Sequence, residues 1–215
     1  MPPYSLTIAV CKGRVLDAVA ELWAHTPWRW PDLGRQLWFP PCDNRPGLII
    51  ARGTDIPALV QGGIAAFGIV GRDILEEQWE PDILEVLDLG IAPCRMVLAS
   101  LDGQWPQGPV RVATKYPEIT RRYFREQSHP VEVVKLSGSL ELSPHIGLAP
   151  YIVDIVQTGQ TLKQHHLREV ETLFASTARL VANPVAWRLG EESEYIYRIF
   201  EKAVRTNSRV SGGRQ

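Results

Sequence analysis

The segment with the clearest chemical signal runs from Asp154 to Leu162 and reads DIVQTGQTL. Its apolar start predicts a buried strand that ends in Thr158-Gly159-Gln160-Thr161. Such a turn directs successive backbone N–H groups into a concavity beside two hydroxyl groups, which suits a phosphate. A plain turn has the same composition, because Thr-Gly pairs are common after strands. No Gly-Lys-Ser/Thr follows at Walker A spacing, so that kind of nucleotide loop is excluded.

Cationic side chains stand next to predicted strands in the first part of the chain. Lys12-Gly13-Arg14 lies where the first strand meets its helix, and therefore at the carboxyl edge where open α/β sheets bind ligands. Arg35 and Arg52 each flank a predicted strand. Guanidinium groups clamp phosphate oxygens in bidentate geometry, but all these cations also fit a solvated surface. Spacing alone leaves both interpretations open.

Two carboxylates, Glu141 and Asp154, lie near the Thr-Gly turn in sequence, where they could accept hydrogen bonds from ribose hydroxyls. Asp154 could equally do no more than end its strand. The histidines pair only as His165-His166, and adjacent side chains point in different directions, so no metal site is expected. We find no Ser-His-Asp or Cys-His arrangement for nucleophilic catalysis.

Composition limits the partners and the compartment. Lys plus Arg number 23 against 24 Asp plus Glu, so no global positive field draws the chain to nucleic acid or to an anionic membrane. No apolar run approaches the roughly 20 residues of a membrane helix, and the N-terminus lacks a signal-peptide pattern. Three cysteines without a CxxC pair argue for a reducing compartment. We expect a cytoplasmic protein without a membrane partner.

The elements that must position these residues are short apolar strands alternating with helical patterns. Strands are predicted at residues 6–10, 47–51, 66–70, 96–101, 110–114, 131–136, 152–156, 170–174 and 178–182. Helices are predicted at 15–23, after 54–55 to about 61, at 72–78, 117–127 and 191–205, and the last eight residues look like a disordered tail. Repeated β-α units that restart after residue 92 predict an α/β fold with two similar halves, whose cleft is a common place for a small-molecule site.

Several segments, taken in order, resemble the ATP phosphoribosyltransferase family. They are IAVCKGRVL (8–16), RGTDIPALVQGGIAAFGIVGRDIL (52–75), RVATKYPEITRRYF (111–124), KLSGSLELSPHIGLAPYIVDIVQTGQTL (135–162) and TARLVAN (177–183). Together they cover most of residues 6 to 183, and five ordered matches are far more specific than one phosphate loop.

The resemblance implies two α/β domains around a cleft, similar to a type II periplasmic binding protein. Residues 1–92 with 182–215 would form domain I on the ATP side, and residues 93–181 would form domain II with the phosphoribosyl pyrophosphate loop. The chain stops soon after its terminal helix, so it resembles the short form of the family, which has no C-terminal regulatory domain.

The implied reaction is attack of the adenine N1 of ATP on C1 of phosphoribosyl pyrophosphate, with loss of pyrophosphate, at the entry to histidine biosynthesis. Magnesium is expected mainly on substrate oxygens and water, with few protein ligands. Short-form enzymes work with a regulatory subunit similar to histidyl-tRNA synthetase. A hetero-oligomer, expected to be a hetero-octamer, is therefore implied.

The resemblance also assigns residues to the two substrates. The implied ATP-side residues are Lys12, Gly13, Arg14, Arg52, Gly71 and Asp73, with Lys12, Arg35 and Arg52 facing the reacting phosphates. The implied phosphoribosyl pyrophosphate residues are Glu141, Asp154, Gln157, Thr158, Gly159, Gln160, Thr161 and Leu162. Gln160 departs from the family, since many relatives have arginine there, and one positive charge beside the phosphate is lost.

Two other functions stay open at this point. A two-lobed binding or sensor protein would share the architecture and bind a ligand without releasing pyrophosphate. A catalytically idle family member would have lost site residues, yet Lys12, Arg14, Arg52, Thr158, Gly159 and Thr161 are all present.

Overall fold

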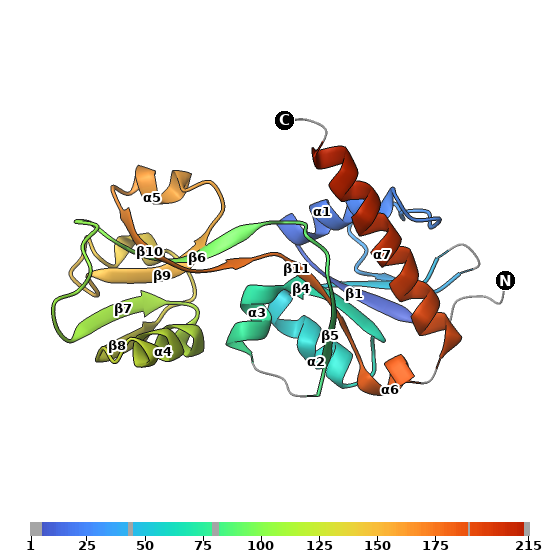
Figure 1. Ribbon diagram of the computed structural model, residues 1–215, viewed down its shortest axis with the longest axis horizontal. Helices are drawn as coiled ribbons and strands as arrows, with labels where there is room; N and C mark the ends of the chain where they lie inside the picture. Colours follow the sequence, from blue (N-terminus) through green and yellow to red (C-terminus); the bar gives the residue numbers. More distant parts are fainter. Residues whose placement is uncertain (1–5, 43–44, 79–81, 189, 213–215) are drawn as a thin grey trace. The chain divides into compact units, whose positions relative to one another are not determined.

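A computed structural model describes residues 6–42, 45–78, 82–188 and 190–212. The chain divides into two compact units: unit 1 comprises Met1–Ala92 and Thr177–Gln215, and unit 2 comprises Pro93–Ser176. Each unit contains one sheet with helices packed on it (Figure 1). The predicted α/β class with two halves is therefore confirmed.

The sheet of unit 1 has the order β2-β3-β1-β4-β11-β5. Its strands are β1 (Thr7–Cys11), β2 (Trp38–Phe39), β3 (Gly47–Ala51), β4 (Phe67–Gly71), β5 (Leu84–Asp88) and β11 (Ala178–Ala182). The central strand β1 is parallel to both β3 and β4, whereas β2 and β11 join antiparallel. The three parallel strands therefore end at one edge of the sheet.

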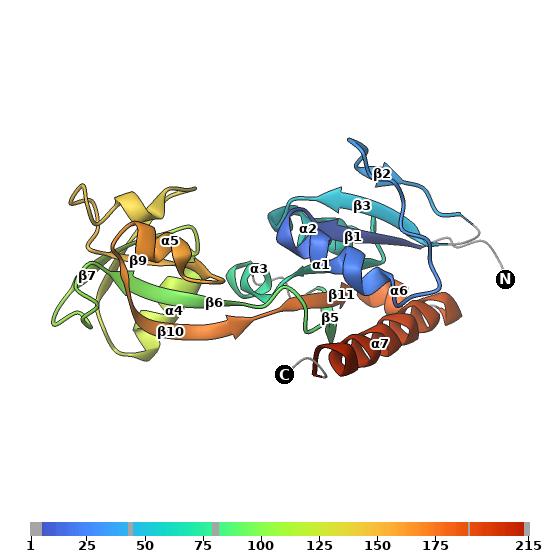
Figure 2. The same cartoon turned by 90° about the horizontal axis from the view of Figure 1, so that it is seen from above.

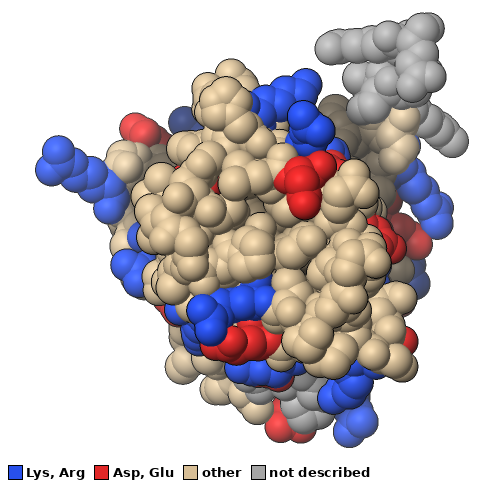
Figure 3. Space-filling model, turned by 90° about the vertical axis from the view of Figure 1, so that its left-hand side faces the viewer, with Lys and Arg blue, Asp and Glu red and all other residues tan. Residues whose placement is uncertain are grey.

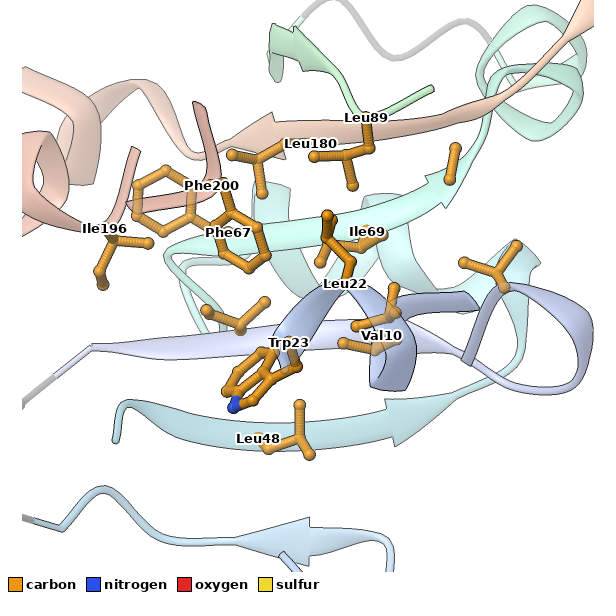
Figure 4. Close-up of a cluster of buried hydrophobic side chains, with 14 of the residues drawn as sticks. Val10, Leu22, Trp23, Leu48, Phe67, Ile69, Leu89, Leu180, Ile196 and Phe200 are labelled. Atoms are coloured by element: carbon orange, nitrogen blue, oxygen red, sulfur yellow. The ribbon is translucent and has the colours of Figure 1, made fainter. Parts of the chain in front are cut away.

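Helices cover both faces of this sheet (Figures 1 and 2). One face packs α1 (Arg14–Trp23) and α7 (Glu191–Gly212), and the other packs α2 (Ile56–Gln61) and α3 (Arg72–Glu77). Alternation along β1 produces the two cores, because Ile8 and Val10 face the α1 side while Ala9 faces α2. In Figure 4, Trp23 of α1 and Phe200 of α7 lie over the aliphatic side chains of the strands.

The sheet of unit 2 has the order β10-β6-β9-β7-β8. Its strands are β6 (Cys94–Ser100), β7 (Val110–Thr114), β8 (Val131–Lys135), β9 (Tyr151–Val156) and β10 (Arg168–Ser176). Strand β7 is parallel to β8 and β9, so these three strands share a carboxyl edge, and β6 runs antiparallel between β9 and β10.

Helical segments of unit 2 complete its cores. Leu140 of η2 (Leu140–Leu142) and Leu162 of α5 (Gln160–Gln164) are buried against β6 and β9. Helix α4 (Pro117–Glu126) packs beside β8 and contributes Phe124, whose ring stacks on Trp105 at 5.8 Å. The loop after β9 is thereby anchored through the buried Leu162.

Most predicted strands are found within one or two residues of their expected bounds, and four corrections follow. Strands β2 and β5, helix α5, helix α6 (Pro184–Arg188) and the 3-10 segments η1 (Gly53–Asp55) and η2 were not predicted. Strand β11 pairs with β4 and β5 in unit 1, so the chain returns at Thr177, five residues before the expected boundary. Strand β10 is longer than predicted because its pairing with β6 extends over seven positions. The expected disordered tail is wrong up to Gly212, because α7 continues through Ser208, whose hydroxyl donates to the Val204 carbonyl.

No helix in the described ranges has the length and apolar character that crossing a membrane requires.

Candidate active site

The carboxyl edge of the parallel strands in unit 1 collects the predicted cations. Cys11, at the end of β1, is in register with Ala51 at the end of β3, and the Lys12 N–H donates to the Ala51 carbonyl at 2.8 Å. Lys12 and Arg52 therefore leave neighbouring strands at the same edge, and both are exposed. The structure brings these two residues together as the β-α pattern predicts.

Arg35 reaches the same edge from β2. Trp38 pairs with Ile49, and the Ile50 N–H donates to the Leu37 carbonyl at 2.8 Å. Because β2 runs antiparallel to β3, its start lies at the carboxyl end of β3, and the turn that holds Arg35 precedes it there. Arg35 is exposed. This edge therefore presents guanidinium groups that suit polyphosphate oxygens.

Gly13 and Arg14 open α1 at this edge. Gly13 has φ of 77° and an open space around it, so the tight entry into the helix uses the freedom of glycine. Arg14 is half-buried, and its Nη1 donates to the Ala92 carbonyl at 2.7 Å. Ala92 is the last residue of unit 1 before the chain leaves it. Arg14 therefore fixes that point of the chain.

Gly71 and Asp73 shape the start of α3. Asp73 is only 6 % exposed, and a Cβ on Gly71 would lie 2.2 Å from its Oδ1. Glycine is thus required for the carboxylate to fold back over the end of β4. Burial and the nearby Asp73 raise the pKa of the Cys11 thiol, Arg14 lowers it, and the net value is about 11. Cys11 is therefore a neutral thiol at neutral pH.

The loop after β9 forms the second half of the candidate site. Gly159 has φ of 76° and ψ of 5°, a left-handed conformation that leads directly into the short helix α5. The Gln160 N–H lies 3.4 Å from the Thr158 hydroxyl, and Gln157, Thr158 and Thr161 are exposed. The first N–H groups of a helix have no partner within it, so the loop offers several donors to an anion. The short helix α5 was not predicted from the sequence, and its first N–H groups favour the phosphate interpretation of this loop.

A charged cluster stands beside this loop. The Lys115 Nζ lies 3.5 Å from the Asp154 Oδ1, and the His165 Nε2 lies 4.0 Å from the Glu141 Oε1. Burial raises the pKa of Asp154, Lys115 lowers it, and Glu141 raises it. The structure thus brings the two predicted carboxylates together.

Lys115 was missed by the sequence analysis, although it follows β7 directly. Thr114 and Val153 are in register in the parallel pair β7–β9, which places Lys115 and Asp154 side by side at the carboxyl edge. The available signal was a lysine at a strand end inside a family-like segment, but the order of strands in the sheet was needed to find its neighbour.

The predicted site residues thus fall into two sets, each gathered at one carboxyl edge. Unit 1 holds Lys12, Gly13, Arg14, Arg35, Arg52, Gly71 and Asp73. Unit 2 holds Glu141, Asp154, Gln157, Thr158, Gly159, Gln160, Thr161 and Leu162. Within the described ranges no cluster of three or more His, Cys, Asp and Glu residues could hold a metal ion.

The opposite end of the sheet in unit 2 is unsuited to a polyanion. A cavity of 680 Å³ there is lined by four prolines, and its one arginine, Arg111, pairs with Glu132 at 2.9 Å. Figure 3 looks onto this end and shows mostly uncharged residues, with basic and acidic side chains interspersed. The carboxyl edges therefore remain the candidate positions for phosphate groups.

Comparison with known proteins identifies the same activity from independent sequences. The family model described as HisG, ATP phosphoribosyltransferase, matches residues 52–203. An ATP phosphoribosyltransferase of Geobacillus sp. (strain WCH70) is 42% identical over 202 residues, which cover 91% of this chain and 98% of that protein. The ATP phosphoribosyltransferase of Bacillus subtilis (strain 168) is 41% identical over 191 residues, covering 87% and 89%.

Solved structures agree with these sequences. The ATP phosphoribosyl transferase (HisG:HisZ) complex from Thermotoga maritima matches with a TM-score of 0.79 and 28% identity, covering 94% of this chain and 99% of that chain. A probable amino-acid ABC transporter extracellular-binding protein from Bacillus subtilis matches with a TM-score of 0.59 at 9% identity, covering 95% and 92%. The second likeness concerns the fold alone and confirms the expected periplasmic-binding-protein-like architecture.

Proposed function

This chain belongs to the ATP phosphoribosyltransferase family, and from that premise we propose how its residues divide the two substrates between them. The reaction joins ATP to 5-phosphoribosyl 1-pyrophosphate, yields N1-(5-phosphoribosyl)-ATP and pyrophosphate, and is the first step of histidine biosynthesis. The binding or sensor alternative is set aside by these relatives. The observation that carries the division of substrates is the pair of carboxyl edges, one rich in free cations and one built from backbone donors and carboxylates.

Unit 2 binds phosphoribosyl pyrophosphate in this proposal. The N–H groups that follow Gly159 and the hydroxyls of Thr158 and Thr161 hold the 5-phosphate, as a left-handed glycine before a helical turn suits an anion. Asp154 and Glu141 accept hydrogen bonds from the ribose hydroxyls. Gln157, Gln160 and Leu162 complete the loop, the last as its buried anchor.

Unit 1 binds ATP and meets the departing pyrophosphate. Lys12 and Arg14 flank Gly13, whose open backbone permits close approach of a phosphate. Gly71 and Asp73 line the ATP side. Arg52 and Arg35 are exposed and stand at the ends of neighbouring strands, so they are the groups assigned to the negative charge that grows during the reaction.

The proposed mechanism needs no covalent intermediate with the protein. The adenine N1 lone pair forms a bond to C1 of the ribose while the C1–O bond to pyrophosphate breaks and takes its electron pair with it. Positive charge develops at the anomeric carbon, as in glycoside chemistry. The protein holds two polyanions in line, and Lys12, Arg35 and Arg52 stabilise the charge on pyrophosphate.

Magnesium fits this scheme as a substrate-bound ion. Asp154 and Glu141 are the carboxylates beside the loop, and Mg²⁺ commonly keeps water and substrate phosphate oxygens with one or two carboxylates at most. When bound, the ion neutralises pyrophosphate charge. In this proposal Asp154 and Glu141 bind the ribose hydroxyls and not the magnesium ion.

The chain is proposed to assemble with a partner of the HisZ type, a regulatory subunit similar to histidyl-tRNA synthetase, in a hetero-octamer. The support is its likeness to the HisG chain of the Thermotoga maritima HisG:HisZ complex. Light scattering of the mixed subunits measures the mass of the assembly. We also propose a cytoplasmic location, which suits three free cysteines.

One assay tests the proposal. Purified protein, with and without a HisZ-type partner, is mixed with ATP, phosphoribosyl pyrophosphate and Mg²⁺, and a pyrophosphatase draws the reaction forward. Phosphoribosyl-ATP is followed by absorbance. We expect product that depends on both substrates, and its absence under both conditions would reject catalysis by this chain.

A further inference from the structure

Lys115 occupies a position that the family resemblance did not assign to any role. It follows β7, and the parallel register of β7 with β9 sets it beside Asp154, with 3.5 Å between the Lys115 Nζ and the Asp154 Oδ1. The side chain of Lys115 is 42% exposed and that of Asp154 is 24% exposed. The pair therefore stands at the surface of the carboxyl edge.

Buried hydrogen bonds fix the backbone on both sides of Lys115. Thr114 is fully buried, and its hydroxyl donates to the Val153 carbonyl at 2.7 Å and accepts the Tyr116 N–H at 2.9 Å. Val153 is the neighbour of Asp154 on β9. The same threonine thus ties the two strands together at the point from which the lysine and the carboxylate project.

The Asp154 carboxylate needs a cation at this place. Its Oδ1 is inaccessible and has no hydrogen-bond partner among the described residues, so the exposed surface of the side chain lies on its other atoms. Burial raises the pKa of Asp154, and the charge of Lys115 is the largest effect that lowers it. A protonated carboxyl group would offer one acceptor fewer to ribose hydroxyls.

The other charged groups around Asp154 cannot replace Lys115. Glu141 on η2 raises the pKa of Asp154, and the group nearest to Glu141 itself is the His165 ring, whose Nε2 lies 4.0 Å from the Glu141 Oε1. On the opposite side, Val97 of β6 faces Asp154, and the nearest cation on that strand, Arg95, pairs with Glu169 at 2.7 Å. Lys115 is the cation that contacts the carboxylate.

We propose that Lys115 is a positioning residue for phosphoribosyl pyrophosphate, which keeps the Asp154 carboxylate ionised and aimed at the ribose hydroxyls. The inference rests on the proposed assignment of Asp154 to the ribose. Because Lys115 acts through Asp154, replacing it should change the pH dependence of kcat/KM beyond the dependence that the substrate phosphates, with second pKa values of about 6, give to every variant.

The test measures kcat/KM for phosphoribosyl pyrophosphate from pH 5.5 to pH 8.5 with saturating ATP and Mg²⁺. The variants are Lys115→Met, Lys115→Arg, Asp154→Asn and a matched control, Lys135→Met, which removes an exposed lysine from the end of the adjacent strand β8. Calorimetric titration with phosphoribosyl pyrophosphate at pH 6 and pH 8 supplies a second readout that does not need turnover.

We expect Lys115→Met to lose about tenfold more kcat/KM at pH 5.5 than at pH 8, because the acid limb of its profile moves toward neutrality. Lys115→Arg should return the acid side of the pH profile to its position in the parent enzyme, and Lys135→Met should not move it. Because the pair is partly exposed, the melting temperature should stay within about 3 °C of the parent.

The outcomes separate this inference from the site assignment. If Asp154→Asn binds phosphoribosyl pyrophosphate as tightly as the parent, the assignment of Asp154 fails and the inference falls with it. If Asp154→Asn is impaired but Lys115→Met lowers kcat/KM by one factor at all pH values, the site stands and the positioning role of Lys115 is rejected. The same rejection follows if Lys115→Arg does not restore the limb.

Discussion

The two carboxyl edges solve the problem of binding anions in different ways. In unit 1 the cations Lys12, Arg35 and Arg52 are exposed, and no carboxylate among the described residues pairs with them. In unit 2 Lys115 at the edge is paired with Asp154, Lys135 at the end of β8 is exposed, and backbone N–H groups after Gly159 provide the proposed anion site. Free guanidinium groups suit a long, charged polyphosphate, while a fixed backbone cradle suits one phosphate of defined position.

The contrast between the two carboxyl edges is tested most directly by replacing Arg52. We expect Arg52→Ala to lower kcat by about a hundredfold or more, since removing one preorganised donor to developing charge costs roughly 3 kcal/mol. The melting temperature should not change, because the side chain is exposed. Initial rates of phosphoribosyl-ATP formation check this, with Arg198→Ala on the surface of α7 as the control. Near-normal turnover would remove Arg52 from the mechanism.

Asp154→Asn tests the other edge, with opposite effects on activity and stability. Ribose binding should weaken, and KM for phosphoribosyl pyrophosphate should rise by more than about tenfold, since hydrogen bonds to a charged acceptor contribute about 1.5–3 kcal/mol. The fold should become more stable at pH 7.5, because burial raises the pKa of Asp154 above 3.8 and the native state holds its proton more tightly than the unfolded state.

The sign of that stability change can be checked by thermal unfolding. The destabilisation by Asp154 grows as pH rises from 3.8 through the raised pKa, and below 3.8 both states of the parent are protonated. The gain from Asp154→Asn should therefore be present at pH 7.5 and vanish near pH 3.5. Asp32→Asn, in an exposed loop, should show no gain at either pH. A variant less stable than the parent at pH 7.5 would contradict the buried-charge account.

Thr161→Ala should give a smaller effect confined to one substrate. Loss of the hydroxyl leaves the backbone donors in place, so KM for phosphoribosyl pyrophosphate should rise about tenfold while KM for ATP and kcat change little. Steady-state kinetics with each substrate varied in turn measure this. An unchanged KM for phosphoribosyl pyrophosphate would count against the loop as its site. Thr206→Ala, on α7, is the matched control.

Gln160→Arg should produce the smallest change and sharpen the contrast between the edges. A cation added at the first position of α5 would supplement the backbone cradle, and KM for phosphoribosyl pyrophosphate should fall about threefold at low salt and less at high salt. Kinetics at two ionic strengths test it. A higher KM would mean that the loop has no room for an arginine.

Sequence patterns predicted the buried strands well and the short or exposed elements poorly. Strands β3, β7 and β11 have the predicted bounds because apolar, mostly buried residues predominate in each of these strands, which read GLIIA, VRVAT and ARLVA. Strand β5 is mostly exposed, β2 has two residues, and α5 has five, so none of them produces a periodic signal. The Thr158-Gly159 turn was recognised, but its continuation as a helix depends on Leu162 finding the core of unit 2.

The sequence predicted which residue types form the candidate site, but not which of these residues lie next to one another. Lys12 was expected at a carboxyl edge because its loop joins a strand to the following helix, and Arg52 was expected to flank a strand. Lys115 was not expected beside Asp154, because these residues lie on strands whose adjacency follows from tertiary pairing and not from the local sequence. The early return of the chain at Thr177 was missed for the same reason, since only pairing with β4 and β5 assigns β11 to unit 1.

Cys11, at the carboxyl edge of unit 1, is an unreactive thiol. A cysteine among cations is commonly a reactive thiolate, yet here burial and Asp73 outweigh Arg14 and hold the pKa at about 11. At physiological pH well under about 0.1% of it is thiolate, the form that electrophiles and peroxide attack. Covalent inhibitors designed against this thiol would therefore react slowly, and peroxide would oxidise it slowly.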